Sequence, residues 1–187
     1  AAAELGVPLT AEIATPLYAA QATDTGWYRF KSTTGDALRV AASLVDAGAV
    51  PQEIYSDIYE QDTLGRLRLR GIVLARTETD LDGRMAHTFL RLSDFEQSGA
   101  VPSDTEDLIN LTLAIKGVEF AVILVEQDAG DFKLSFRSRC GVDCSRLAQQ
   151  FGGGGHRAAA GAGIDGPFED AQPKVLAAVR EAMQAAV

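Results

Sequence analysis

Apolar residues in the first part of the chain recur at the three- and four-residue spacing of α-helices. The spacing predicts three helices, which begin near Thr10, at Thr33 or Thr34, and at Pro51. Gly48 is expected to end the second helix. The buried stripes of the three helices are predicted to be Ile13, Leu17 and Ala20, then Leu38, Ala41 and Val45, and then Ile54 and Ile58. The chain up to residue 61 is therefore expected to be mostly helical.

Residues 62–75 have no single clear period. The two alternatives rest on different residues, which are Leu67, Leu69 and Val73 for a strand, or Leu64, Leu67 and Leu74 for a helix. The residues leave this choice open. A boundary between two parts of the chain is predicted here, with residues 62–75 as the linker.

From residue 76 onward, strand patterns alternate with helix patterns. Asp82-Gly83 is a typical hairpin turn, residues 84–92 alternate as a strand, and the apolar run 118–125 predicts a central strand. His87 falls on the apolar face of the first of these strands, so it is interpreted as a core or edge histidine rather than a ligand. The alternation indicates an α/β or α+β class.

Polar residues and proline mark the expected helix boundaries in this part. Asp143 is expected to cap a helix that leads to Phe151, and the last helix is predicted to follow Pro173. Two further helix starts are predicted from the spacing of capping boxes, which are Ser93 with Glu96 and Ser103 with Glu106.

The strand predicted from residue 132 separates apolar residues from potential hydrogen-bond donors. The period of two places Phe132, Leu134 and Phe136 on one face. The opposite face then carries Lys133, Ser135, Arg137 and Arg139. A row of donors on one sheet surface suits an anionic ligand.

Four consecutive glycines, residues 152–155, follow the next predicted helix and precede His156 and Arg157. Glycine takes positive φ angles and lets backbone N–H groups approach a bound group, and the histidine and arginine favour a phosphate. A flexible linker is the alternative, but the apolar small-residue run 158–163 argues against it, because linkers are usually polar. The glycine segment and the donor-bearing strand face are expected to flank one cleft.

Composition narrows the class of ligand. The chain has 187 residues, 47% of them hydrophobic, and a formal net charge of −9, which disfavours generic nucleic-acid binding. Residues 132–157 nevertheless contain five basic side chains and one acidic side chain, which indicates a selected anionic ligand unless the cluster is a chance feature of a solvated face. Cys140 and Cys144 give only a weak metal signal and suit free thiols in a reducing cytosol. No apolar run is long enough to span a membrane.

A short polar turn, Thr23-Asp24-Thr25-Gly26, leads into the aromatic stretch Trp27-Tyr28-Arg29-Phe30. The carboxylate of Asp24 suits either of two roles, as a ligand of a divalent metal ion or as a cap of the local backbone. The residues alone leave both roles open.

Several of these segments together resemble one family. Ser135-Phe136-Arg137-Ser138 and Phe151-Gly-Gly-Gly-Gly-His156-Arg-Ala-Ala-Ala-Gly161 resemble the DHH-associated domain that ends many DHH phosphoesterases. The Thr23–Phe30 stretch is similar to the last metal-binding motif of the catalytic DHH domain, and Glu106–Asn110 with Lys116–Glu119 also fits the associated domain. The resemblance covers essentially the whole chain and is greatest to the bifunctional oligoribonucleases and phosphoadenosine-phosphate phosphatases.

The resemblance implies a division of the chain. Residues 1–61 correspond to the C-terminal tail of the catalytic domain and are expected to expose apolar surface. Residues 62–75 are the linker, and residues 76–187 form an α/β substrate-binding domain with a mixed central sheet flanked by helices. The family holds two manganese ions mainly through N-terminal motifs, including an Asp-His-His triplet that this chain lacks. Asp24 is the one metal ligand that can be carried over, so the chain is interpreted as the C-terminal part of the enzyme.

The resemblance also implies substrates and the residues that bind them. The expected partners are short single-stranded RNA or a nucleoside bisphosphate, in the cytoplasm and away from membranes, with a homodimer left open. Substrate binding is expected from Arg137, Gly153, Gly154, Gly155 and His156, and less from Arg139 and Arg157. The alternatives are a non-catalytic module that binds nucleotides or RNA ends, and an appendage of a tRNA synthetase. The chain alone is expected to hydrolyse nothing.

Overall fold

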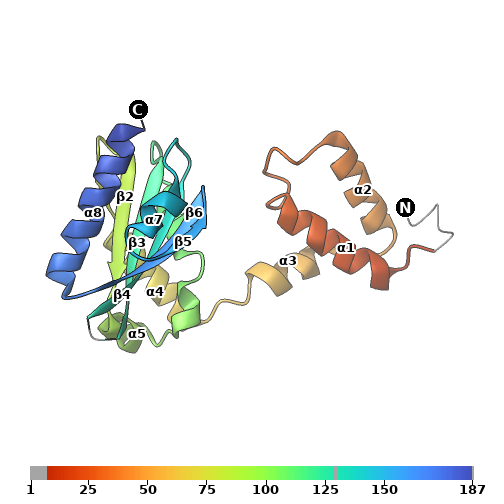
Figure 1. Ribbon diagram of the computed structural model, residues 1–187. Coiled ribbons are helices and arrows are strands. Elements are labelled where there is room, and N and C mark those ends of the chain that lie inside the picture. Colours follow the sequence, from red (N-terminus) through yellow and green to blue (C-terminus); the bar gives the residue numbers. More distant parts are fainter. Residues whose placement is uncertain (1–7, 129, 187) are drawn as a thin grey trace. The chain divides into compact units, whose positions relative to one another are not determined.

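The computed structural model describes residues 8–128 and 130–186 (Figure 1). The chain forms two compact units, and the boundary between them falls between Asp62 and Thr63. In the described residues, no helix is both long enough and apolar enough to cross a membrane.

The first unit contains the three predicted helices, α1 (Ala11–Asp24), α2 (Gly35–Asp46) and α3 (Pro51–Tyr59). Thr34 caps α2, because its side chain accepts a hydrogen bond from the backbone N–H of Ala37. Pro51 occupies the first turn of α3, where its missing N–H costs no hydrogen bond.

The buried faces of these helices differ from the predicted stripes. Ile13 and Leu17 are 37% and 48% exposed, and the buried residues of α1 lie one position further along. Both sets have helical spacing, so the period cannot choose between them. The Tyr18 ring contacts the rings of Trp27 and Tyr28, which turns the Tyr18 face of α1 inward. The core of the unit consists of Ala14, Tyr18, Ala22, Ala41, Leu44, Ala49 and Ile54, while Leu38, Val45 and Ile58 are exposed.

The second unit is a mixed α/β domain. Its helices are α4 (Leu64–Ala75), α5 (Leu92–Ser98), the 3₁₀ helix η1 (Pro102–Thr105), α6 (Leu108–Leu113), α7 (Cys144–Gln149) and α8 (Phe168–Ala185). Its strands are β1 (Glu78–Asp80), β2 (Met85–Leu90), β3 (Phe120–Asp128), β4 (Asp131–Ser138), β5 (Gly154–His156) and β6 (Ala159–Asp165). The six strands form one sheet in the order β1-β2-β3-β4-β6-β5. Among the strands that the structure describes, only the β2–β3 pair is parallel, so the predicted mixed sheet is confirmed.

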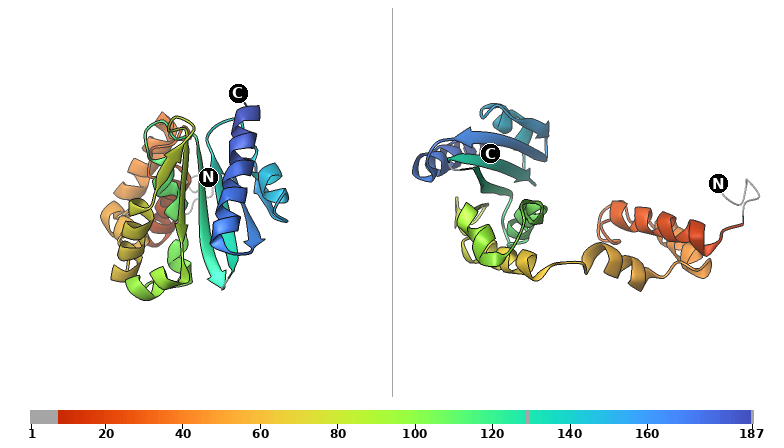
Figure 2. Two further views of the ribbon diagram at one scale, coloured as in Figure 1. Left: turned by 90° about the vertical axis from the view of Figure 1, so that its left-hand side faces the viewer. Right: turned by 90° about the horizontal axis from the view of Figure 1, so that it is seen from below.

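Helices cover the two faces of this sheet unequally (Figure 2). On one face, α7 and α8 pack against the buried phenylalanines of β3 and β4. On the other face, α4 and α6 pack against β2 and β3 through Leu69, Val73, Leu108 and Ile109. On that second face the side chains of β4 beyond β3 are partly or fully exposed. The half of this face formed by β4, β6 and β5 is therefore accessible to a ligand.

The segment expected to be a linker contains a helix of the second unit. Residues 64–75 form α4, capped by Thr63, whose side chain accepts a hydrogen bond from Arg66 N–H. Leu69 and Val73 of this helix are fully buried. Gly65 leaves no room for a side chain, because a Cβ there would lie 2.5 Å from the carbonyl oxygen of Gly99.

Three predicted helix starts also differ from the structure. The carboxylate of Asp94 accepts a hydrogen bond from Arg91 N–H at 2.7 Å, and Asp104 accepts one from Val101 N–H at 2.9 Å. These aspartates lie in the first turns of α5, which begins at Leu92, and of η1, which begins at Pro102, so the predicted serine–glutamate boxes are wrong. Helix α8 begins at Phe168, before Pro173, because the Phe168 ring packs on Phe89 and Phe132 and anchors the preceding turn.

Candidate functional site

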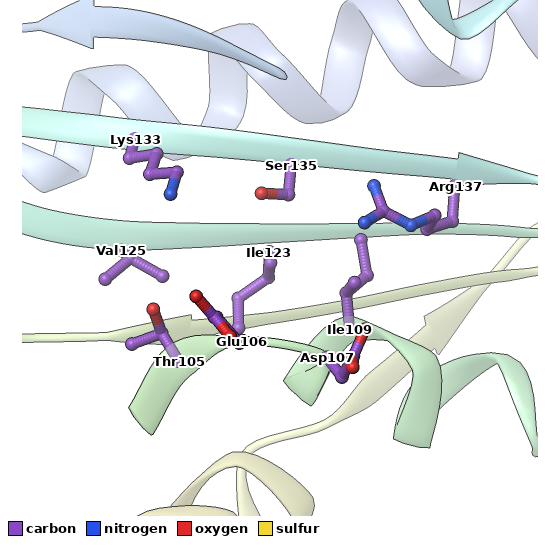
Figure 3. Close-up of a pocket in the computed structure, with 9 residues that line it drawn as sticks. All are labelled: Thr105, Glu106, Asp107, Ile109, Ile123, Val125, Lys133, Ser135 and Arg137. Atoms are coloured by element: carbon purple, nitrogen blue, oxygen red, sulfur yellow. The ribbon is translucent and has the colours of Figure 1, made fainter. Parts of the chain in front are cut away.

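A pocket of about 260 Å³ opens on the accessible half of the sheet (Figure 3). One side of it is formed by β3 and β4, and the other by the segment that joins η1 to α6. The lining residues are Thr105, Glu106, Asp107, Ile109, Ile123, Val125, Lys133, Ser135 and Arg137.

The alternation of β4 sets the direction of its donors. Phe132, Leu134 and Phe136 are at most 2% exposed and belong to the core beneath α7 and α8. Their burial fixes the register of the strand, so the intervening Lys133, Ser135 and Arg137 must face the opposite side. The predicted division of this strand into an apolar and a donor-bearing face is confirmed.

Arg137 is the strongest anion-binding group of the pocket. Its Nη1 donates to the carbonyl oxygen of Phe136 at 3.0 Å, and it forms no ion pair with any described residue. Figure 3 shows the guanidinium lying along the strand on the side of Ser135. Most of its N–H donors are therefore free to bind a planar anion, such as a phosphate or carboxylate, in a bidentate way.

Two carboxylates on the opposite wall were missed as site residues. Glu106 and Asp107 line the pocket across from β4, and Asp107 accepts a hydrogen bond from Asn110 at 2.9 Å. Asp107 has a φ of 62°, a left-handed conformation that is unusual outside glycine. The pocket thus offers acceptors as well as cations, which suits a ligand that carries hydroxyl or amino groups beside an anion. The sequence signals for them are two adjacent acidic residues before an apolar helix, and the resemblance of Glu106–Asn110 to the associated domain.

The surface beside the pocket is a floor of small residues. Arg137 pairs with Ala159 of β6, which pairs with His156 of β5. Directly paired residues of antiparallel strands share a face, so Arg137 and His156 lie in one row, separated by two strand spacings of about 5 Å each. The adjoining rows add Ser135, Gly161 and Gly154, and then Lys133 and Gly163. We call Gly154, Ala159, Gly161 and Gly163 the small-residue floor.

The fold does not explain all the glycines of this floor. Gly154 and Gly163 lack a positive φ, and an added Cβ would meet nothing within 4 Å at Gly154 and only the Phe132 carbonyl oxygen, at 4.0 Å, at Gly163. Neither the backbone nor the packing therefore requires glycine there. Their effect is to leave the sheet surface flat, so that a ligand can lie against the backbone.

The glycine run is part strand, not the predicted loop. Residues 154–156 form β5 against β6. Gly153 N–H donates to the Ala148 carbonyl oxygen at 2.9 Å. This N–H is therefore already bonded within the protein, contrary to the prediction that it binds a substrate. An added Cβ at Gly153 would lie 2.1 Å from Gly161 O, and at Gly155, where φ is 147°, 2.7 Å from Ala160 Cα. These two glycines are needed to bring β5 close to β6.

The remaining predicted binding residues separate into two groups. His156 and Arg157 are exposed, with His156 at the end of β5 beside the floor and Arg157 in the turn to β6. Arg139 is not part of the pocket, because it lies beyond β4 and its Nη1 donates to the Leu113 carbonyl oxygen at 2.8 Å. That contact places its charge at the C-terminus of α6, where a cation is favourable. Arg139 thus lies outside the pocket and stabilises the end of α6, and its role in substrate binding stays a prediction.

Asp24 lies in the first unit, exposed in the last turn of α1. Its side chain makes no hydrogen bond or ion pair with the described residues, and capping is done by Thr25, whose hydroxyl accepts from Tyr28 N–H at 3.1 Å. Within the part of the chain that the structure describes, no group of three or more His, Cys, Asp or Glu residues could hold a metal ion. One carboxylate does not suffice to hold a manganese ion, so the described residues alone do not form a metal site. The role of Asp24 as a ligand stays a prediction.

His87 packs where the sequence placed it, 7% exposed on β2. Burial lowers its pKa, against the opposing effect of the carboxylates of Glu78 and Asp80, while Arg180 lowers the pKa further. Its Nε2 lies 3.8 Å from Glu78 Oε2. It is an edge residue of the core and lies outside the pocket, as interpreted.

The lowered pKa of His87 predicts a loss of stability in acid. The unfolded chain takes up the proton first, at a pH near 6.5, so the free energy of unfolding should fall as pH decreases below that value toward the folded pKa. Urea unfolding between about pH 8 and about pH 5 measures this slope in the wild type and in His87→Gln. The variant should lose part of the slope, and identical slopes in both proteins would contradict the prediction.

Known proteins share the part of the chain that forms this site. The DHHA1 domain family matches residues 82–185, which include the whole pocket and the small-residue floor. The chain is 39% identical over 178 residues to the "Bifunctional oligoribonuclease and PAP phosphatase NrnA" of Thermus thermophilus, covering 95% of this chain and 53% of that protein. The protein of the same name from Bacillus subtilis is 30% identical, covering 86% of this chain and 50% of that protein.

A solved structure also resembles this chain in fold. The exopolyphosphatase-related protein from Bacteroides fragilis superposes with a TM-score of 0.81 at 29% identity, covering 94% of this chain and 51% of that one. The chain spans about half the length of the curated relatives it matches. On the match to residues 82–185, this chain belongs to the DHHA1 domain family of DHH-related proteins.

Proposed function

We propose that the second unit binds the phosphorylated end of a short single-stranded RNA, or a nucleoside bisphosphate, for a phosphoesterase of the DHH family. The observation that supports this most is Arg137, which forms no ion pair with the described residues and lies beside a flat floor of small residues. A cation next to a flat apolar surface suits a phosphate joined to a planar base and sugar.

Each part of such a ligand has a matching group. Arg137 and Lys133 would bind the phosphate, with His156 at the far end of the row. The base and sugar would lie on Gly154 and the rest of the small-residue floor, where no side chain intervenes. Glu106 and Asp107 would accept hydrogen bonds from ribose hydroxyl or base amino groups. A free polyanion lacks these donors and would be repelled by the two carboxylates.

The names of the relatives indicate the type of reaction. Two of them are named oligoribonuclease and PAP phosphatase, so hydrolysis of short oligoribonucleotides and nucleoside bisphosphates is the activity we propose for the protein to which this chain contributes. Asp24 would bind a manganese ion there only together with ligands from outside the described residues. Such an ion would activate water and stabilise the charge on the phosphate.

A non-catalytic nucleotide-binding module is the second candidate for the chain by itself. It is favoured by the missing metal-ligand cluster among the described residues. In both cases the binding residues are the same, so binding is the property to measure first.

Calorimetric titration with adenosine monophosphate tests the proposal. We expect weak binding that weakens further as salt is raised, because the main contacts are ionic. Adenosine and ribose 5-phosphate, each lacking one half of the ligand, should bind less well than the nucleotide. Binding of ribose 5-phosphate as strong as that of the nucleotide would remove the role of the floor, and an absence of binding would overturn the proposal.

A further inference from the structure

The first unit contains a second pocket, of about 290 Å³, lined by Trp27, Arg29, Tyr55 and Tyr59. It is built entirely from residues before the unit boundary. We call these four residues the aromatic box. The aromatic box shares no residue with the pocket beside β4, so its own side chains determine which ligand it can bind.

The Trp27 ring stands nearly perpendicular to both tyrosine rings, which are themselves 5.0 Å apart and tilted by 42°. The Trp27 and Tyr55 rings have centroids 5.0 Å apart at an interplanar angle of 76°, and the Trp27 and Tyr59 rings are 5.7 Å apart at 88°. Tyr55 and Tyr59 lie one helical turn apart on the same face of α3, and their side chains are 39% and 44% exposed. A planar group can therefore stack on one ring while its edge meets another, as nucleobases do on aromatic platforms.

The backbone around Trp27 adopts a conformation that is unfavourable for bulky residues. Gly26, Trp27 and Tyr28 have φ angles of 57°, 57° and 62°, and such left-handed values are unfavourable for bulky residues. The turn is held by Trp27 N–H, which donates to the Ala22 carbonyl oxygen at 2.6 Å. Residues kept in this conformation by surrounding contacts cluster at functional sites.

The charge of the box selects among aromatic ligands. Arg29 Nε donates to the Gly26 carbonyl oxygen at 2.8 Å, and no described residue forms an ion pair with its guanidinium. None of the four lining residues is acidic. A cationic ligand would be repelled by Arg29, whereas a ligand that joins a planar ring to an anion satisfies both features.

We infer that the aromatic box binds one nucleotide unit of single-stranded RNA, with the base against Trp27, Tyr55 and Tyr59 and a phosphate on Arg29. The box is then a nucleotide site additional to the pocket beside β4. A mononucleotide fills the two sites independently.

The fluorescence of Trp27 reports on the box alone, because it is the only tryptophan of the chain. Adenosine monophosphate should quench this fluorescence in a saturable way when the indole is excited at the red edge of its absorption. Ribose 5-phosphate should leave it unchanged. Quenching by both compounds alike, or by neither, would overturn the inference.

Variants separate the box from the other site. Arg29→Gln should raise the dissociation constant from Trp27 quenching roughly tenfold, the size of a charge-assisted contact, and Tyr59→Leu should also raise it roughly tenfold by removing a stacking ring. Arg39→Gln, an exposed arginine of the same unit outside the box, is the matched control and should change nothing. Far-ultraviolet circular dichroism checks that each variant is folded.

Arg137→Ala separates this inference from the proposed function. It should leave Trp27 quenching unchanged, because Arg137 lies in the other unit. Loss of quenching in Arg137→Ala would show that Trp27 only senses the pocket beside β4, and would overturn the inference. Quenching that survives Arg29→Gln and Tyr59→Leu at full strength would do the same.

Discussion

Replacement of Arg137 by alanine is expected to raise the dissociation constant for adenosine monophosphate at the pocket beside β4 roughly tenfold to a hundredfold. A hydrogen bond between charged groups contributes about 1.5–3 kcal/mol, and the guanidinium of Arg137 has only one partner within the described protein, the Phe136 carbonyl oxygen. The free energy of unfolding should change little, because no ion pair with a described residue is lost. Titration calorimetry at low salt measures the change.

Arg146→Ala is the matched control for this experiment. Arg146 belongs to the same unit, its side chain is 85% exposed, and its ion pair with Asp143 is long, at 3.9 Å. It does not line the pocket beside β4. Equal affinity in the wild type, Arg137→Ala and Arg146→Ala would show that the phosphate binds elsewhere. Arg137→Lys should recover only part of the affinity, because lysine keeps the charge and loses the planar fork.

The second large effect is expected on stability, at Gly153. A Cβ at this position would lie 2.1 Å from Gly161 O and 2.5 Å from Ala162 Cα, both of them backbone atoms that cannot swing away. Gly153→Ala should therefore force β5 away from β6 and lower the free energy of unfolding by about 3 kcal/mol. A thermal unfolding curve should show a midpoint lower by roughly 10 °C.

Gly154→Ala gives the comparison one residue away. Its Cβ would meet nothing within 4 Å, and its φ is ordinary. The free energy of unfolding should stay within about 0.5 kcal/mol of the wild-type value, as for other uncrowded surface positions, so the midpoint should shift little. Should both variants unfold at the same temperature, the close approach of β5 and β6 would not depend on glycine at position 153.

The sequence predicts best where one period dominates. The alternation of β4 has a single solution, because shifting it by one residue would bury Lys133 and Arg137. The prediction therefore gives the correct face for the donors, whereas the other wall of the pocket is formed by residues 105–109 and not by the predicted glycine segment. The α1 stripe fails for the opposite reason, since Leu17 and Tyr18 both have apolar neighbours at helical spacing and only the contacts of Tyr18 with Trp27 and Tyr28 decide between them.

Other features of the site depend on contacts between distant segments, which no local pattern contains. Glu106 and Asp107 come near Arg137 only because α6 packs on β3. Arg139 has the right spacing for the donor row, but the carbonyl of Leu113, far away in sequence, takes its guanidinium. The glycine run reads as a loop because glycine disfavours strands, yet its pairing with the small residues of β6 makes Gly154–His156 a strand.

The pairing of β5 with β6 also limits which changes in chain length the site can tolerate. His156 shares a face with Arg137 only because Arg157 and Ala158 separate it from Ala159, its partner in β6. Adding or removing one residue in this turn would shift the pairing by one position and turn the imidazole to the opposite side of the sheet. The short hairpin, although it faces solvent, is therefore a position where substitutions are tolerated far better than insertions or deletions.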